Sequence, residues 1–229
     1  MQTIDCTGKT TREINQAVRA LVSAGEREIE LRHPAARHNL AVAVLEPVRV
    51  VIDGPVGYYC AGMIDGAQIE VRGSAGWGLA ESMLSGMVIV GGHAGNGAAA
   101  SIRGGTVMVR GDAAARAGIA MKGGLLIVGG AAGYMTGFMM QRGTIIVCGD
   151  AGPALGDSMY EGVVYVGGEI AELGNDTVVS EASGDELAGI RQALDRHGVK
   201  GPETFRKIVS GRKLWNYDKK EFEVWKAAF

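Results

Sequence analysis

Residues 86–142 of this 229-residue chain divide into three consecutive units of 19 residues: GMVIVGGHAGNGAAASIRG (86–104), GTVMVRGDAAARAGIAMKG (105–123) and GLLIVGGAAGYMTGFMMQR (124–142). Each unit opens with a glycine and continues with apolar residues two positions apart, such as Val88 and Val90. Apolar residues with a period of two predict a strand that buries one face. Self-similarity at a fixed period predicts a repeat architecture for this part of the chain.

Glycines carry the same period well beyond these three units. Residues 48–168 hold 29 of the 37 glycines. We expect a turn at each member of one glycine column, because only glycine adopts a positive φ without steric cost. Its members are Gly54, Gly73, Gly92, Gly111, Gly130, Gly149 and Gly168. Apolar columns that start at Val50 and Ile52 keep the period, and so does a third that runs Ile64, Met83, Ile102, Met121, Met140 and Met159.

A 19-residue unit is too short for a crossover connection of the βαβ type, which takes about 30 residues. Coils that pair in parallel with their neighbours would bury the apolar columns instead. We therefore predict an all-β fold, a single-stranded right-handed parallel β-helix of about seven 19-residue coils with short α-helical N- and C-terminal flanks. The predicted domains are an N-terminal helix/strand cap over 1–47, the β-helix over 48–175 and a C-terminal helical and aromatic tail over 176–229.

The flanks carry their own signals. Residues 11–24 have apolar residues at helical spacing, with Glu13 three residues after Thr10 as a start signal. Residues 27–32 and 40–45 are expected as strands, and residues 184–198 and 202–210 as helices. We expect these pieces to cap the open ends of the β-helix, which would otherwise expose unpaired strand edges.

Composition limits the classes of partner. The chain has 23 basic and 25 acidic residues and a net charge of −2, which does not favour a nucleic-acid partner. No apolar run approaches the length of a membrane span, and the N-terminus lacks the apolar core of a signal peptide. Three widely spaced cysteines form neither a metal-binding pair nor a disulfide framework. We expect a cytoplasmic protein.

The sequence shows no active site of its own. The four histidines are not at metal-ligand spacing, and Cys60 lies in a column of small or apolar residues that favours packing over reactivity. A β-helix lyase would need an exposed cluster of Asp, Arg and Lys. The corresponding column is an irregular mixture of Asp65, Leu84, Arg103, Lys122, Gln141 and Tyr160. We expect no catalytic residue, cofactor site or metal site on this chain.

The repeated glycine turns and VxVxG strands closely resemble the GXGXG domain at the C-terminal end of the glutamate synthase large subunit. The segments that carry the resemblance are GYYCAGM (57–63), AESMLSGMVIVGG (80–92), MKGG (121–124), VCGDAGPALGDSMYEG (147–162) and GRKLWNYD (211–218). Within this group they look most like the free-standing β-helix subunit of N-methylglutamate synthase, also called methylamine–glutamate N-methyltransferase.

The resemblance implies a hetero-oligomeric enzyme in which this chain is structural. It implies a glutaminase-like (class II amidotransferase) subunit and an FMN-binding synthase subunit with an iron–sulfur cluster as partners. Residue 2 is Gln2 rather than the cysteine nucleophile of the glutaminase domain, so no family catalytic residue carries over. The implied reaction converts glutamate and methylamine to N-methylglutamate and ammonia. The alternatives are a subunit of a glutamate synthase relative or the C subunit of a formylmethanofuran dehydrogenase/formyltransferase complex.

One outward-facing column predicts an interface. The residues between the two inward columns of the main strand point outward, and six of the seven are apolar. We predict that a partner subunit packs on this column and on two aromatic residues of the tail: Val51, Ile89, Met108, Ile127, Ile146, Tyr165, Trp215 and Tyr217. The alternatives are that a terminal helix of the same chain covers the column and that the aromatic tail packs back on the body.

Overall fold

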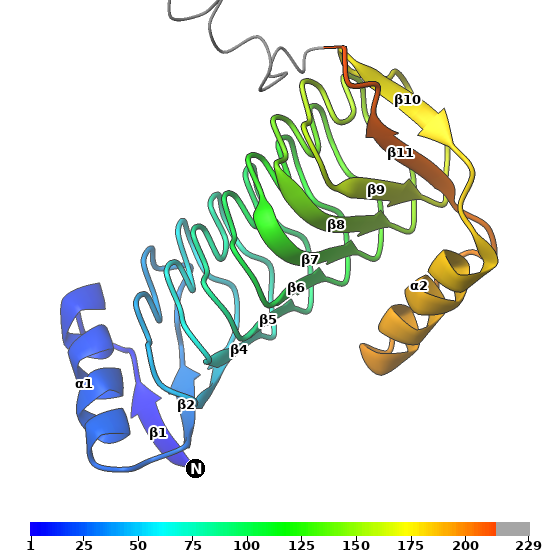
Figure 1. Cartoon of the computed structure of the whole chain (residues 1–229). Helices are drawn as coiled ribbons and strands as arrows, with labels where there is room; N and C mark the ends of the chain where they lie inside the picture. The colour runs from blue at the N-terminus through cyan, green and yellow to red at the C-terminus, as the bar shows by residue number, and fades with distance from the viewer. Residues whose placement is uncertain (214–229) are drawn as a thin grey trace, which may run out of the picture.

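The computed structural model describes residues 1–213, which form a parallel β-solenoid of about seven turns flanked by two helices (Figure 1). A single 11-stranded sheet runs along the solenoid in the order β1-β2-β3-β4-β5-β6-β7-β8-β9-β11-β10. The elements are β1 (Gln2–Asp5), α1 (Thr11–Ser23), β2 (Glu28–Arg32), β3 (Arg49–Asp53), β4 (Gln68–Val71), β5 (Met87–Val90), β6 (Thr106–Val109), β7 (Lys122–Val128), β8 (Arg142–Val147), β9 (Val163–Val166), β10 (Thr177–Ser180), α2 (Gly184–Arg196) and β11 (Arg206–Ser210).

The coils stack in the predicted register. From β3 to β9 each strand pairs in parallel with the strand one coil away, for example Val50 with Ile69 and Val88 with Val107. A second, weaker ladder of isolated bridges runs beside the sheet from Val56 through a column of alanines to Ile170. The predicted fold class is therefore confirmed.

A third segment of each coil has an unusual backbone. In the coil around Ala80, three residues two positions apart, Gly78, Ala80 and Ser82, all have φ near +60°. Gly78 and Ser82 donate their N–H groups to the following coil, whereas Ala80 donates to Cys60 of the preceding coil. Positive φ costs L-residues about 1–2 kcal/mol each. The hydrogen bonds to both neighbouring coils offset that cost.

The predicted turn glycines lie at bends as expected, but for a different physical reason. Of Gly54, Gly73, Gly92, Gly111, Gly130, Gly149 and Gly168, only Gly54 has a positive φ. The others are required because a Cβ would collide with the coil before: at Gly149 it would lie 2.8 Å from the carbonyl carbon of Gly130. The positive-φ glycines of the coils belong to other columns, such as the one of Gly86, Gly105 and Gly124.

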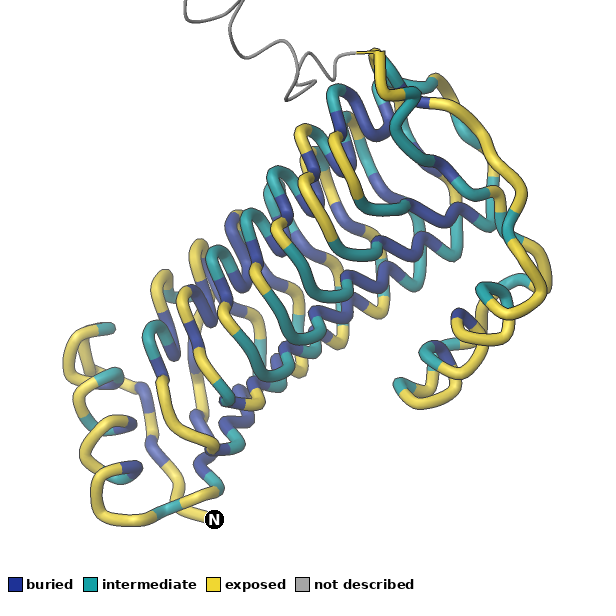
Figure 2. The backbone as a smooth tube through the Cα atoms, viewed as in Figure 1, coloured by how far each residue is buried: buried dark blue, intermediate teal, exposed yellow. Residues whose placement is uncertain are grey.

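The inward columns form one continuous core (Figure 2). The column from Ile64 to Met159 is at most 2% exposed, and the Val50 and Ile52 columns are equally buried. Stacking of similar side chains in successive coils explains why each column keeps residues of similar volume.

The N-terminal flank closes one end of the solenoid. Helix α1 begins with the predicted capping box, in which Thr10 and Glu13 bond to each other's backbone, and it buries Ile14, Val18 and Val22 against the core. The prediction of a strand over 40–45 is wrong, because this segment has left-handed residues such as Ala41 and Ala43 and bonds to the turn segment of the next coil. Strand β2 pairs with β3, so the ladder extends across the boundary expected at residue 48.

The C-terminal flank differs more from the prediction. Helix α2 forms as expected, but residues 202–210 are not a helix. They contain β11, which lies antiparallel between β9 and β10 and buries Ile208 in the core. Helix α2 also does not cap the end of the solenoid. It lies against the outer face of the sheet (Figure 1).

Candidate functional site

The predicted interface column is occupied by the chain's own helix. Met108, Ile127, Ile146 and Tyr165 are at most 5% exposed and form a cluster of their own with Ile190 and Leu194 of α2. The prediction that a partner subunit packs directly on these four residues is corrected accordingly. An exposed apolar sheet face of this size would favour association or aggregation. Helix α2 covers it, because Ile190 and Leu194, four residues apart, lie on the same side of the helix and pack against the sheet.

Hydrogen bonds at its first turn hold α2 in place. Glu186 accepts from the hydroxyl of Tyr165 at 2.8 Å and from Lys207 Nζ at 2.6 Å. It also bonds the backbone N–H of Ser183 in a capping box. These donors, Lys207 first, lower the pKa of Glu186 to about 2, and burial together with Glu186 raises the pKa of Tyr165. One carboxylate thus joins the helix to both β9 and β11.

The other predicted interface residues have separate surroundings. Ile89 lies at the border of the α2 cluster and is half-buried. Val51 is buried between its ladder neighbours Glu30 and Glu70. Trp215 and Tyr217 lie outside the described residues.

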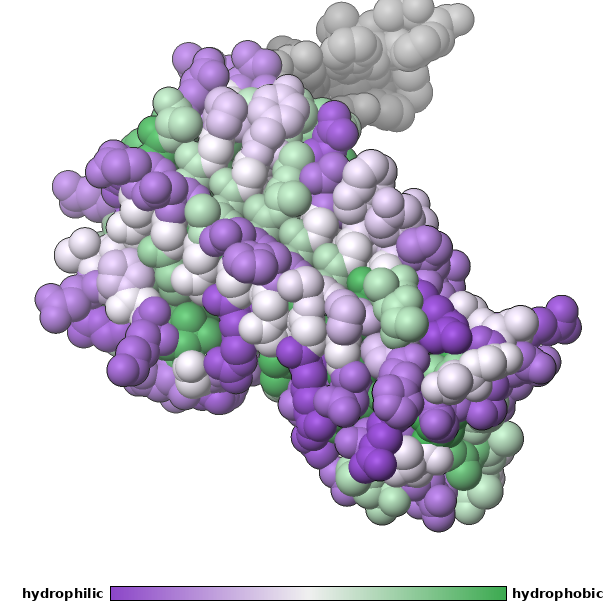
Figure 3. All heavy atoms as spheres, turned by 180° about the vertical axis from the view of Figure 1, so that it is seen from behind, coloured by the Kyte–Doolittle hydropathy of each residue, from purple (hydrophilic) through white to green (hydrophobic). Residues whose placement is uncertain are grey.

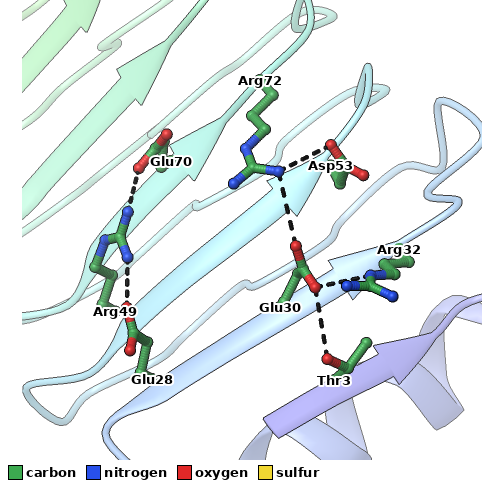
Figure 4. A network of polar contacts seen from close by, with 8 residues as sticks. All are labelled: Thr3, Glu28, Glu30, Arg32, Arg49, Asp53, Glu70 and Arg72. Atoms are coloured by element: carbon green, nitrogen blue, oxygen red, sulfur yellow. Dashed lines mark hydrogen bonds and ion pairs between the residues drawn. The ribbon is translucent and has the colours of Figure 1, made fainter. Parts of the chain in front are cut away.

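Beyond α2 the same sheet face becomes charged (Figure 4). Arg49 bonds Glu28 and Glu70 on the strands to either side, and both carboxylates raise its pKa. Glu30, only 4% exposed, accepts from Arg32 at 2.8 Å and lies 3.7 Å from Arg72. Arg72 also pairs with Asp53. Each cation of this network lies beside an acid, which neutralises the face over β2–β4.

The cysteines have the properties of packing residues. Cys60 is fully buried, and burial raises the pKa of its thiol to about 12. Burial likewise raises the pKa of Cys148 to about 11. A nucleophilic cysteine needs a lowered pKa and access to substrate. The packing interpretation of Cys60 is in keeping with this geometry.

The histidines take part in local hydrogen bonds. His38 Nδ1 accepts the backbone N–H of Tyr58 at 2.8 Å, and its ring begins a stack that continues through Tyr58 to Trp77. His93 Nδ1 accepts the N–H of Asp112 on the next coil. Within residues 1–213 no group of three or more His, Cys, Asp or Glu side chains is placed to hold a metal. The described helices include none long and apolar enough to cross a membrane.

The rear of the molecule carries a band of weakly polar and apolar residues. Viewed from behind, white and pale green residues run along the middle of the rod between purple borders (Figure 3). Several large apolar side chains are exposed on the coils, including Tyr59, Met63 and Trp77, each between 48% and 54%. Two of them recur in their 19-residue columns, since Tyr58 and Tyr134 are equivalent to Trp77 and Met139 is equivalent to Met63, and all three equivalents are exposed as well.

Comparisons with known proteins find the same fold in a multi-subunit complex. No family model matches the chain. A segment of 72 residues is 41% identical to Protein GlxC of Rhizobium meliloti (strain 1021), and this match spans about a third of either chain, 31% here and 32% there. The solved structure of the formyltransferase/hydrolase complex (FhcABCD) from Methylorubrum extorquens, in complex with methylofuran, contains a chain with the same fold. It superimposes with a TM-score of 0.68 over 86% of this chain and 85% of that chain, at 22% identity.

Proposed function

We propose that this chain is a non-catalytic assembly subunit of a glutamate-synthase-type complex, with N-methylglutamate synthase as the specific enzyme. In this role it links a glutaminase-like subunit to an FMN-binding synthase subunit. Those partners carry the nucleophile, the flavin and the iron–sulfur cluster, so this chain supplies position rather than chemistry.

The architecture of the solenoid carries the proposal. Its interior is filled by stacked side chains, and the thiol of Cys60 inside it is kept protonated. Coils joined at every step by backbone hydrogen bonds form a stiff rod whose lateral surfaces are available for binding. Such a rod is suited to holding two larger subunits at a fixed separation.

The sequence match and the structural match support different parts of the proposal. The 41% identity with Protein GlxC favours the glutamate-synthase-type assignment. The structural match belongs to a multi-subunit complex and supports a hetero-oligomer, although at 22% identity it extends to the fold alone. That match is the observation in favour of the second candidate, a subunit of a formyltransferase complex.

Co-purification from the native host tests the proposal. We expect the tagged chain to bring down a flavoprotein and an amidotransferase-like subunit, identified by mass spectrometry. The chain purified alone should be colourless and should turn over neither glutamine nor methylamine. A stoichiometric flavin spectrum of the isolated chain would refute the non-catalytic role, and recovery of formyl-transferring subunits would favour the second candidate.

A further inference from the structure

Three cations occupy one corner of the solenoid, where the left-handed segment of each coil leads into the sheet. Arg103 and Lys122 are equivalent residues on successive coils, since their N–H groups bond the carbonyls of Met83 and Ile102. Lys122 is in turn the ladder partner of Arg142 in β8. Neighbouring strands lie about 4.8 Å apart, so the three side chains start from adjacent positions along the rod.

A register shift brings the third cation into line. Gln141 keeps the place that the 19-residue period gives it, since its N–H bonds the carbonyl of Met121 at 2.8 Å. The N–H of Arg142 bonds the same carbonyl at 3.1 Å, and Arg142 is the ladder partner of Lys122. The regular offset returns at Leu125, which pairs with Thr144. The irregularity is confined to this corner, and its effect is to place a positive charge beside Lys122 in addition to the neutral amide of Gln141.

This arrangement lowers stability in the isolated chain. Like charges directly opposite in a sheet repel one another. Arg142 has an acid, Glu161, at 3.3 Å. In residues 1–213 neither Arg103 nor Lys122 has an ion pair or a side-chain hydrogen bond. On the sheet face over β2–β4, by contrast, the cation Arg49 is neutralised by Glu28 and Glu70 on the neighbouring strands (Figure 4).

The corner is also hollowed. A surface cavity of about 570 Å³ is lined by Lys122, Met139, Gln141, Arg142, Tyr160 and Glu161. A second hollow of about 510 Å³ shares Tyr160 and Glu161 and continues toward Lys207 and Arg212. Together they form a depression that runs across coils and contains more cations than acids. Its lining reaches from Lys122 of β7 past β8 to Lys207 of β11, an arrangement that suits an extended chain better than a compact small molecule.

We propose that the corner formed by Arg103, Lys122 and Arg142 binds an acidic polypeptide segment of a partner subunit. This inference rests on the proposed function, since it assigns a docking chemistry to an assembly subunit. Carboxylates of the partner neutralise Lys122 and Arg103, while the amide of Gln141 and the ring of Tyr160 contact the intervening residues. The partner thereby relieves a repulsion that the free chain retains.

An acidic probe peptide tests the inference. The probe is a fluorescein-labelled decapeptide of alternating glutamate and serine, with glutamine in place of glutamate in the control peptide, followed by anisotropy at low salt. We expect Arg103→Gln/Lys122→Gln to weaken binding about five- to tenfold, the sum of two exposed ion pairs. The matched variant Arg12→Gln/Arg19→Gln removes two exposed cations of α1 and should bind as the unmodified protein does. Added salt should weaken binding.

Two further readouts separate the possible outcomes. Because repulsion is removed and neither side chain has an ion pair to lose, the Arg103→Gln/Lys122→Gln protein should melt no lower than the unmodified protein, so lost binding cannot be attributed to unfolding. Equal loss in both double variants, or displacement of the peptide by an equal concentration of free glutamate, would overturn the inference. Intact co-purification of partners without peptide binding would also overturn it and leave the proposed function standing. Peptide binding by a chain that recovers no partners would refute the proposed function alone.

Discussion

Substitution of Gly149 by alanine tests whether close approach of the coils, rather than backbone conformation, requires glycine at the bends. A Cβ at this position would lie 2.8 Å from the carbonyl carbon of Gly130, 2.9 Å from its oxygen and 3.0 Å from the nitrogen of Ala131. All three atoms are backbone, so no side-chain rotation can relieve the contact. The coils must separate by ~0.6 Å to reach ordinary van der Waals distance.

That separation lengthens hydrogen bonds on both sides of the residue. Gly149 donates to Gly130 at 2.9 Å, and Cys148 donates to Val128 at 2.9 Å. Overpacking costs about 1–3 kcal/mol, and each weakened bond adds a part of its ~1 kcal/mol. We therefore expect Gly149→Ala to lower the free energy of unfolding by about 3 kcal/mol, which shifts the melting temperature of a chain of this size by roughly 6–12 °C.

Two other glycines provide the same chemical change without the collision. Gly97 has a φ of +70° and no atom within 4 Å of the place that an added methyl group would take, and residues such as Arg116 and Met135 adopt the same φ in its column. Gly97→Ala should cost about 1 kcal/mol. Gly189 lies inside α2 with open space around it, so Gly189→Ala should stabilise by about 0.5–1 kcal/mol. Thermal melts followed by far-ultraviolet circular dichroism measure all three. A Gly149→Ala protein that melts like the unmodified chain, or no differently from Gly97→Ala, would refute the reasoning.

Three further predictions concern α2 and the core. Leu194→Ala should weaken the packing of α2 on the sheet by about 2–4 kcal/mol. We expect faster proteolysis between residues 181 and 205 and binding of a hydrophobic dye to the uncovered sheet. Unchanged cleavage would contradict this prediction. Because the pKa of Glu186 is lowered to about 2, its contribution is present above the unfolded pKa near 4.5 and is lost as the pH falls from there toward 2. The protection of the α2 amides against hydrogen exchange, taken relative to the intrinsic exchange rate at each pH, should therefore fall over that range, and much less so in Glu186→Gln. The Cys60 thiol, with a pKa of about 12, should resist a thiol reagent at pH 8 until the protein unfolds; prompt labelling of Cys60 in the native state, located by mass spectrometry, would show that the core opens.

The repeat made the solenoid predictable from sequence. Columns such as the one through Val88 and Val107 specify a strand, its inward face and its neighbour one coil away, because identical positions must stack. Both flanking helices were also predictable, since each has a capping box and an apolar stripe. The left-handed segments were not, because alanine and serine, unlike glycine, give no signal for positive φ.

The errors arose where tertiary pairing overrides local preference. The segment around Ala41 is apolar throughout, as a buried strand is, yet its backbone follows the turn segment of the next coil. Pro202 suggested a helix start, whereas Ile208 is drawn into the ladder by pairing with Val164. The outward apolar column was visible, but its sequence could not tell an internal helix from a partner. The 19-residue alignment placed Arg103 and Lys122 in one column, but it could not show that Arg142 joins them through the irregular pairing of β7 with β8.

The reversal of β11 has a consequence for how copies of this chain meet. A rod built from identical parallel steps has complementary ends, and head-to-tail addition of further rods would generate an open filament. Here β11 runs antiparallel to β9, and β10 runs antiparallel to β11, so the outermost strand β10 has the same direction as the parallel strands β1 to β9. Strand direction alone therefore leaves this end open to a parallel strand of a second molecule. The end differs from the repeat in its connection instead, because β10 and β11 are joined through α2 rather than by a 19-residue coil, so an added molecule would meet a strand pair in place of a coil.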